Sequence, residues 1–433
     1  MPQQSSSSPP PSSSSLSNLV RLTPLQLSDL PVHPDLPRPE TDDGKGRVDL
    51  VAFLTALLDN GASFLNPSAF ASTFKHQSMK SSPPSAVPVE ILGYSIPKSA
   101  IARIQWSGST SASVTGVGHG LSSTSPPSVD VGDPNGSATP VVPRVSRSTP
   151  SSSSLGPENW VARRSVHKDI SSKDVTRPGH ALWDEFVYGL RDDHSKHEAD
   201  FTPTLYDAHC VVDWSDVLQQ SQVQETLRRN GYMACSMGVY EMCHVIPPPL
   251  SPRCFPVVVV TASICRDSSS LSKETNFSRP VTRTKRENED DDEDCFIAVT
   301  VPVDLTSSRI PVPTALYSTQ RNLREGKTPQ QRKRVVMGAY AAVETVRRKR
   351  NRSSSSSSTT GQQTRGQAQA QANGKTENQH EIEWIMATAS DAKGNLPLWM
   401  QKMGVPGAVA KDVGYFMKWI KGVDDAEMKS RRL

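Results

Sequence analysis

The sequence contains few cysteines, little net charge and no long apolar run, and each of these shortages excludes a class of protein. Six cysteines in 433 residues are too few for a small fold held together by disulfides. No apolar run reaches the length of about 18 residues that a membrane-spanning helix needs. The excess of 48 Lys and Arg over 44 Asp and Glu is too small to indicate specific nucleic-acid binding. The first basic residue is Arg21 and the start lacks an apolar core, so we expect no secretory signal and a soluble, cytoplasmic protein.

The motifs of common enzyme classes are absent as well. The chain contains no phosphate-binding loop, dinucleotide fingerprint, kinase motif or G-x-S-x-G elbow. Two His–Cys neighbours, at 209–210 and 243–244, lack the second pair of ligands that a metal site would need. We therefore expect no metal, no cofactor and no catalytic residue.

Proline and serine, in contrast, are abundant. The chain has 35 prolines, and its serines gather in long runs. Segments of this composition cannot bury enough apolar surface to form a packed core. The segments predicted to be disordered on these grounds are 1–17, 107–157, 266–294 and 351–380.

The rest of the chain predicts one main domain with an N-terminal extension. Two of the disordered segments, 266–294 and 351–380, would be insertions in this domain. The predicted divisions are a mostly disordered N-terminus at 1–47, a segment with a helix and a possible edge strand at 48–106, a disordered linker at 107–157, the main domain at 158–424, and a basic tail at 425–433.

Strands dominate the predicted secondary structure, and one long helix ends it. Alternating or continuous apolar patterns predict strands at 160–167, 200–212, 232–246, 254–265, 295–303, 335–347 and 382–389. Short helices fit at 178–190, 215–229 and 397–403. From Pro406 onward, Val409, Val413 and Phe416 recur at helical spacing, which predicts a longer terminal helix. The fold class is therefore α+β, with the last helix packed on an antiparallel sheet.

Two charge runs are expected to lie at the same end of this sheet. In a meander, the insertions that carry the acidic run 289–294 and the basic run 347–352 leave from one end. We predict that the two runs pair there and partly cancel. The alternative is that both are solvated loops with no mutual role.

A single carboxylate interrupts an apolar face of the strand at 232–246. Glu241 lies among alternate apolar or thiol residues, and a lone buried charge is costly unless it is paired. Arg163 or Arg164 of the first strand could be its partner, and such a pair could hold the polar end of a ligand. The alternatives are a purely structural ion pair or a position at the margin of the sheet.

Five runs of the chain are distinctive: WVARRSVH at 160–167, GLRDDHSKHE at 189–198, FTPTLYDAH at 201–209, MGVYEMCHVIPPPLSPRCFPV at 237–257, and ATASDAKGNLPLWMQKMGVPGAVAKDVGYFMKWI at 387–420. Together they resemble the fungal DUF3074 family, whose domain is START-like. The resemblance implies a helix-grip fold, in which a curved antiparallel sheet surrounds a long C-terminal helix with an apolar cavity between them. Related START-like domains hold a lipid or sterol in this cavity.

The first functional hypothesis is accordingly a non-enzymatic protein that binds or transfers a lipid or sterol. Its expected partners are that ligand and, transiently, a membrane surface, and it would act as a monomer. The residues expected to bind the ligand are Arg163, Arg164, Tyr240, Glu241, Tyr340, Trp384, Met386, Trp399, Val413 and Phe416.

Two other functions stay open at this point. A cyclase- or hydratase-type enzyme would need an acid–base pair in the pocket, such as His209 with Glu241. An interaction scaffold would have a collapsed pocket. Three glycines near the terminal helix, Gly404, Gly407 and Gly414, have two interpretations as well: a helix loosened to admit a ligand, or close packing against the sheet.

Overall fold

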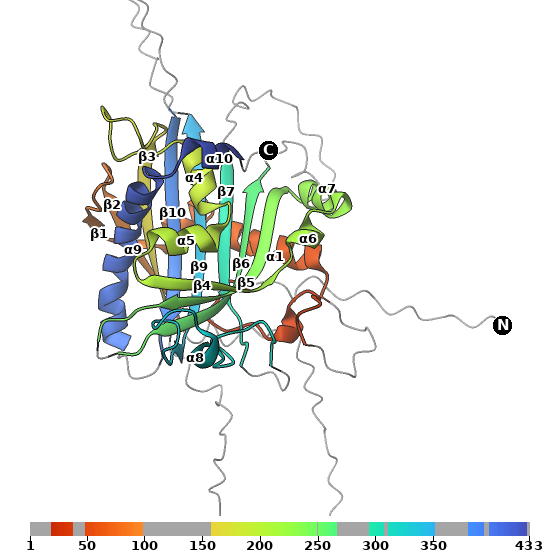
Figure 1. Cartoon of the computed structure of the whole chain (residues 1–433). Helices are drawn as coiled ribbons and strands as arrows, with labels where there is room; N and C mark the ends of the chain where they lie inside the picture. The colour runs from red at the N-terminus through yellow and green to blue at the C-terminus, as the bar shows by residue number, and fades with distance from the viewer. Residues whose placement is uncertain are drawn as a thin grey trace, which may run out of the picture.

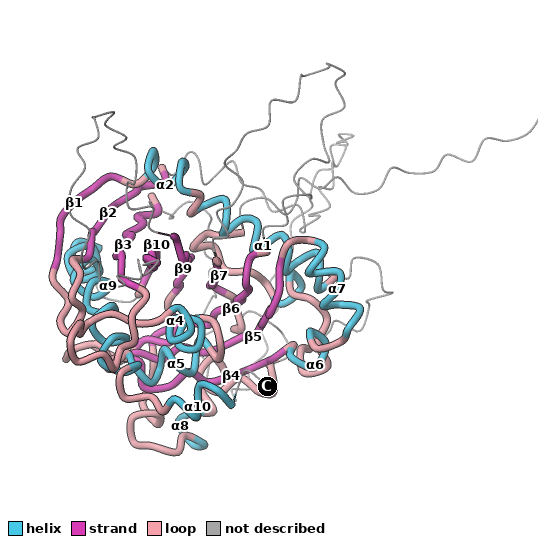
Figure 2. The backbone as a smooth tube through the Cα atoms, turned by 90° about the horizontal axis from the view of Figure 1, so that it is seen from above, coloured by secondary structure: helices cyan, strands magenta, loops and turns pink. Residues whose placement is uncertain are grey.

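Ten strands pair into one strongly curved sheet in this computed structural model (Figures 1 and 2). The structure describes residues 19–37, 48–97, 157–248, 250–265, 294–306, 311–350, 380–393 and 398–430, with the backbone alone for 398–403. The segments predicted to be disordered lie almost entirely outside these ranges. The strands are β1 (Lys75–Lys80), β2 (Val89–Ile96), β3 (Glu158–Lys168), β4 (Leu205–Asp213), β5 (Tyr232–His244), β6 (Arg253–Ile264), β7 (Cys295–Pro302), β8 (Val336–Met337), β9 (Ala339–Arg350) and β10 (His380–Asp391).

The strand order is β1-β2-β3-β10-β9-β7-β6-β5-β4, and every pair along it is antiparallel. Only the two-residue β8 pairs in parallel, with β6, outside this path. The helices are α1 (Leu50–Phe64), α2 (Pro67–Thr73), α4 (Trp183–Leu190), α5 (His194–Phe201), α6 (Ser215–Leu218), α7 (Ser221–Arg229), α8 (Asn322–Glu325), α9 (Leu398–Ile420) and α10 (Asp425–Ser430), with a short 3-10 turn η2 (Leu27–Asp29). Within the described parts of the chain, no helix is both long enough and apolar enough to cross a membrane.

The two faces of the sheet carry different helices (Figure 2). The concave face holds α4, α5 and α9, and the convex face holds α1, α2 and α7. Because side chains alternate along a strand, each strand serves both faces. In β10, Trp384 and Met386 pack with α9 on the concave face, whereas Ile385 and Ala387 belong to the core under α1.

Helix α1 fills the centre of the convex face. Asp49 caps it by accepting a hydrogen bond from the Ala52 backbone N–H at 2.7 Å. Its buried apolar side chains, Phe53, Leu54, Leu57 and Leu58, recur at helical spacing and form one stripe against the sheet. The helix predicted within 48–106 is therefore present as α1, and a strand predicted there is present as β2, although β1 and not β2 forms that edge of the sheet.

Helix α9 is longer than the sequence predicted. The two expected helices, 397–403 and the one beginning at Pro406, are a single 23-residue helix with Pro406 in its interior. Its buried stripe is the expected one and includes Val409, Val413 and Phe416. A proline costs an interior helix one backbone hydrogen bond, so the prediction of a helix start there was reasonable but wrong.

A second error concerns the segment before β4. The strand predicted at 200–212 begins only at Leu205, because α5 continues to Phe201. The chain reverses at Asp193, whose φ of 43° is left-handed, and α5 begins at the next residue. This short polar helix supplies three residues to the cavity described below, His194, Glu198 and Phe201.

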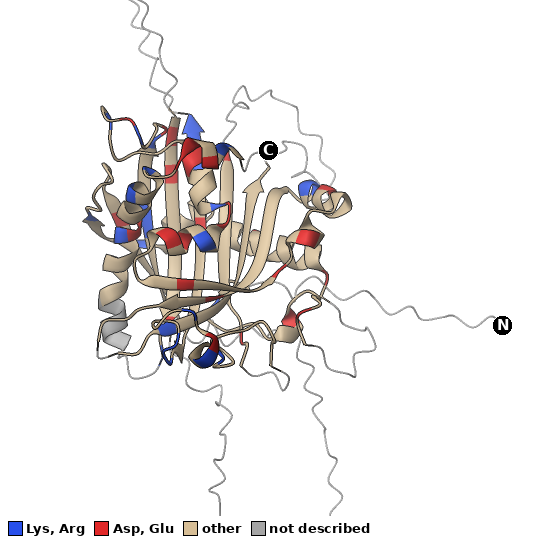
Figure 3. Cartoon of the chain, in the orientation of Figure 1, with Lys and Arg blue, Asp and Glu red and all other residues tan. Residues whose placement is uncertain are grey.

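The predicted pairing of the two charge runs is seen at Asp294, the residue of the acidic run that the structure describes. Arg348 donates its backbone N–H to the Asp294 carbonyl at 2.9 Å, and its guanidinium lies 3.4 Å from the Asp294 carboxylate. The other residues of the acidic run lie outside the described residues. Figure 3 shows acidic and basic residues interspersed over this side of the molecule instead of a patch of one sign.

Candidate functional site

A small cavity lies between the concave face of the sheet and helices α5 and α9. Its volume is about 40 Å³, and its floor consists of residues from β3, β7, β9 and β10. Apolar side chains such as Met386 and Phe201 form part of the wall. The titratable side chains that line it are Arg163, His194, Glu198, Tyr340, Glu344 and Asp412.

Arg163 is the cation at the centre of this cavity. Its side chain is 2% exposed, its Nη2 donates to Glu344 Oε1 at 3.0 Å, and its guanidinium lies 3.9 Å from the centre of the Trp384 ring. The same Glu344 oxygen accepts the Trp384 indole N–H at 2.6 Å. The Nε and Nη1 groups of Arg163, however, are buried without a hydrogen-bond partner. An unmet buried donor costs about 1–3 kcal/mol, and more when it is charged, so these two groups are suited to an acceptor that enters the cavity.

Two further carboxyls face Arg163 from the helices. Burial raises the pKa of Asp412 of α9 to about 7, and the negative charges of Glu198 and Glu344 add to this rise. Burial also raises the pKa of Glu198 of α5, while His194, whose Nε2 lies 3.9 Å away, works against the rise. The cavity therefore contains at least one carboxyl that changes charge near neutral pH.

The whole cavity lies inside the region that a protein-family comparison recognises. Residues 160–420 match the family model described as "Protein of unknown function (DUF3074)". The chain belongs to the DUF3074 family. Its membership confirms the family expected from the sequence runs, and the observed antiparallel sheet around a long C-terminal helix confirms the expected fold class.

The similarities of the DUF3074 chain to solved structures are distant. Human STARD10 matches with a TM-score of 0.36 and 9% sequence identity. The match covers 86% of this chain and 82% of the STARD10 chain. A second match is the human StarD13 (DLC2) lipid transfer and protein localization domain, with a TM-score of 0.30 and 10% sequence identity. It covers 83% of this chain and 96% of the StarD13 chain. Similarities at this level say nothing about a ligand. A comparison with curated protein sequences found no match.

Four of the ten predicted site residues line the cavity of this DUF3074 domain: Arg163, Tyr340, Trp384 and Met386. Tyr240 lies next to it, in the apolar cluster that Phe255 and Tyr340 also join. Val413 and Phe416 pack in the core under α9, and the Trp399 side chain lies outside the described residues.

Glu241 does not meet Arg163 or Arg164, and its predicted place in the cavity is wrong. Its carboxylate is fully buried on the convex face, where Oε2 accepts the backbone N–H groups of Leu316 at 2.8 Å and Tyr317 at 2.9 Å. Oε1 accepts the Ser318 N–H at 2.6 Å. Tyr240 and Glu241 are neighbours on one strand and point to opposite faces, so one cavity cannot contain both.

The acid–base pair that an enzyme would need, His209 with Glu241, also lies outside the cavity. His209 and Glu241 are indeed partners across β4 and β5. His209 Nε2, however, lies 2.9 Å from the Thr314 carbonyl, so both side chains hold the chain segment at 311–318. Neither faces the cavity, and the pair is structural.

Arg164 likewise points to the convex face. It lies 2.7 Å from Glu383 and 3.7 Å from Glu90. Lys349 continues this row of alternating charges beyond Glu383, and His76 continues it beyond Glu90. Arg164 therefore belongs to a row of ion pairs across five strands and not to the ligand site.

Sequence reasoning missed four titratable residues of the cavity: His194, Glu198, Glu344 and Asp412. Asp412 lies three residues after Val409 and four before Phe416, so it shares their face of α9. A charged residue on the apolar face of a predicted helix could have indicated that Asp412 faces a cavity. His194 and Glu198 gave none, because the helix that carries them has no apolar stripe.

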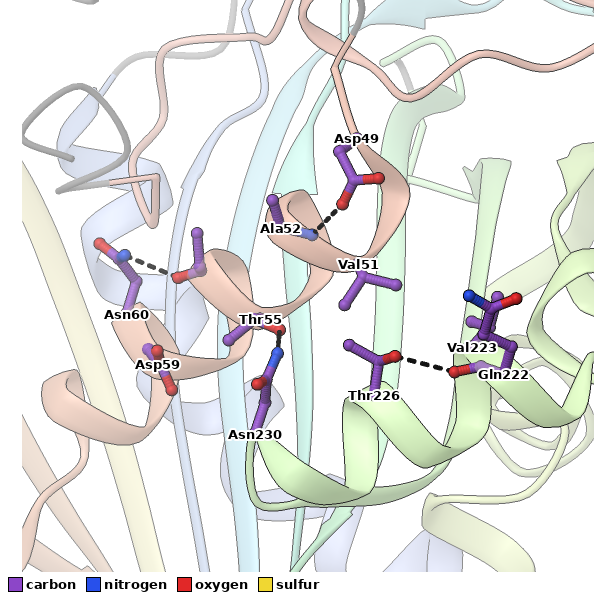
Figure 4. Close-up of a pocket in the computed structure, with 11 residues that line it drawn as sticks. Asp49, Val51, Ala52, Thr55, Asp59, Asn60, Gln222, Val223, Thr226 and Asn230 are labelled. Atoms are coloured by element: carbon purple, nitrogen blue, oxygen red, sulfur yellow. Dashed lines mark hydrogen bonds between the residues drawn. The ribbon is translucent and has the colours of Figure 1, made fainter. Parts of the chain in front are cut away.

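A larger hollow on the convex side, between α1 and α7, is a weaker candidate (Figure 4). Its volume is about 700 Å³. The polar groups drawn in it bond to one another: Asn230 donates to Thr55 at 3.0 Å, and Thr226 donates to the Gln222 carbonyl at 2.8 Å. No buried group there lacks a partner, in contrast to Arg163. Among the described residues, no cluster of three potential metal ligands exists.

Proposed function

We propose that the protein binds an apolar molecule, a lipid or sterol, whose polar end enters the cavity at Arg163. The observation that carries this proposal is the pair of unpartnered donors on Arg163, in a side chain that is 2% exposed and lines a cavity. Such groups are rare in folded proteins unless a ligand or water satisfies them. Trp384 and Met386 add an apolar wall beside the guanidinium.

The size of the cavity determines which part of the ligand it can hold. Sites for whole drug-sized ligands have volumes of roughly 300–1,000 Å³, far above the 40 Å³ here. The cavity of the described residues therefore fits only a polar end, and the apolar part needs a displacement of α9. The first half of this helix is suited to move, because Pro406 removes a backbone hydrogen bond and a Cβ on Gly404 or Gly407 would meet nothing within 4 Å.

Native mass spectrometry of the full chain tests the proposal. The protein purified from a eukaryotic host should carry a stoichiometric apolar molecule that organic extraction releases. The Arg163→Met variant should lose it, and Arg163→Lys, which keeps the charge beside Glu344, controls for misfolding. Arg164→Met is the matched control, because Arg164 is the next residue on the same strand and points to the opposite face. An empty wild-type protein that takes up no added lipid would contradict the proposal.

A second candidate function is acid–base catalysis on an apolar substrate. The observation in its favour is the pair of cavity carboxyls with raised pKa values, Asp412 and Glu198. An enzyme would release a chemically altered product, whereas a binding protein returns its ligand unchanged. Mass analysis of the extracted molecule before and after incubation distinguishes the two.

A further inference from the structure

The charges around the cavity restrict the chemistry of the polar end. One arginine, Arg163, faces three carboxyls, those of Glu198, Glu344 and Asp412. Glu344 already accepts from Arg163 and Trp384. Asp412 has no hydrogen-bond or ion-pair partner among the described residues, so the cavity contains free acceptors as well as free donors.

We infer that the polar end of the bound ligand is an uncharged hydroxyl group, which places the ligand among the alcohols of the lipid class. This inference rests on the proposed function. A hydroxyl oxygen can accept from Nε or Nη1 of Arg163, while its hydrogen is donated to a carboxyl of Asp412 or Glu198. A single hydroxyl group then bonds both to an unpartnered donor of Arg163 and to a carboxyl acceptor.

Charged ends fit less well. A carboxylate or phosphate would meet Arg163 but would also lie among three carboxyls, and it would lose its hydration shell on entry. An ammonium group would meet the carboxyls but would lie beside the guanidinium. The volume of 40 Å³ leaves room for only a few water-sized groups, which a hydroxyl and one water would fill.

A competition between three ligands with the same tail tests this inference. The full chain is incubated at pH 7.5 with equal amounts of hexadecan-1-ol, hexadecanoate and hexadecylamine, delivered from cyclodextrin. The protein is then separated by gel filtration, and the retained compounds are quantified after extraction. The alcohol should exceed each charged analogue by about tenfold or more.

Variants identify the residues that discriminate between the alcohol and its charged analogues. Arg163→Met should lower the retained alcohol by about tenfold, whereas Arg164→Met should not change it. The double change Asp412→Asn with Glu198→Gln should raise the share of hexadecanoate about fivefold, because it removes two negative charges that oppose an anion. Asp200→Asn, on the exposed side of α5, should leave the shares unchanged.

The outcomes separate this inference from the proposed function. Retention of none of the three compounds, and of no cholesterol delivered in the same way, would overturn the proposed function itself. Retention of hexadecanoate or hexadecylamine as strongly as the alcohol would overturn the hydroxyl assignment and leave ligand binding intact. Unchanged shares in the double variant would also overturn it, because the carboxyls would then not select.

Discussion

Glu241 is a buried carboxyl residue that bonds to the backbone of one irregular segment. Its two oxygens accept three consecutive backbone N–H groups, from Leu316, Tyr317 and Ser318. Hydrogen bonds to a charged acceptor are about twice as strong as neutral ones. The residue therefore fastens the segment at 311–318 to the convex face, with His209 as a second attachment point.

Replacing Glu241 should destabilise the protein more than an ordinary surface change. Glu241→Ala leaves one buried and two partly buried N–H groups unmet and should lower the free energy of unfolding by about 2–4 kcal/mol, measured by urea denaturation. Glu241→Gln, which keeps one acceptor oxygen, should lie between this variant and the wild type. The control is Glu225→Gln on exposed α7, which should have little effect. A Glu241→Ala protein with an unchanged unfolding midpoint would show that the segment is held by other contacts.

The raised pKa of Asp412 leads to a prediction of how the free energy of unfolding depends on pH. Its pKa is raised to about 7 in the folded protein, above the value of about 3.9 in an unfolded chain, so the folded state binds more protons between these values. The free energy of unfolding should therefore fall as the pH rises from about 4 to 7, by an amount on the order of 4 kcal/mol from this group. Glu198, with a raised pKa in the same cavity, adds a slope of the same sign.

The test is urea denaturation of Asp412→Asn between pH 5 and pH 8. The amide resembles the protonated carboxyl, so the variant should match the wild type near pH 5 and exceed its stability at pH 8. His194, Arg163, Tyr340 and Glu344 face the same cavity and remain in both proteins, so they do not account for the difference. Equal stability of the two proteins at pH 8 would mean that Asp412 is ionised at no cost.

At the scale of elements, the glycines of α9 differ in their surroundings. A Cβ on Gly414 would lie 2.5 Å from the Pro83 carbonyl oxygen and 2.8 Å from that of Ser82, so this glycine lets the β1–β2 loop approach the helix. Gly404 and Gly407 have no such neighbours. Close packing therefore explains Gly414, and the loosened helix remains an interpretation for the other two.

Alanine at these positions should separate the two interpretations. Gly414→Ala should lower the melting temperature, because backbone of the loop must move. Gly404→Ala and Gly407→Ala should each stabilise the helix by up to about 1 kcal/mol. If the first half of α9 opens for the ligand, the double variant should also exchange its ligand more slowly. Faster exchange, or a stabilised Gly414→Ala, would contradict this account.

Elements with a regular apolar pattern could be predicted from the sequence, and the site could be predicted only where it lies on them. The strands around Arg163 and Trp384 and the stripe of α9 follow from alternation and helical spacing. Helix α5 could not be foreseen, because it is short and polar and depends on the turn at Asp193, so Glu198 was missed. The partner of Glu241 could not be foreseen either, because the segment at 311–318 is irregular and joins Glu241 through its backbone.

At the scale of the molecule, segments far apart in the sequence complete one sheet with two covered faces. The concave face is covered by α4, α5 and α9, which all follow β3 in the chain. The convex face is covered by α1 and by the segment at 19–36, and β1 and β2 extend the sheet beyond β3. The cavity floor on β3 therefore depends on N-terminal residues that never touch the cavity.

A fragment of residues 158–433 should accordingly fail to fold, although it contains every described residue of the cavity. Its loss of Phe53, Leu54, Leu57 and Leu58 alone removes four fully buried side chains, worth about 1.5–3 kcal/mol each, from a protein whose expected stability is about 5–15 kcal/mol. It also leaves β3 as an unpaired edge. Circular dichroism and urea denaturation should show no cooperative transition for this fragment, whereas deletion of residues 1–18 should leave the transition of the full chain in place. A cooperative fragment that still binds ligand would show that the concave face and its helices form a folding unit of their own.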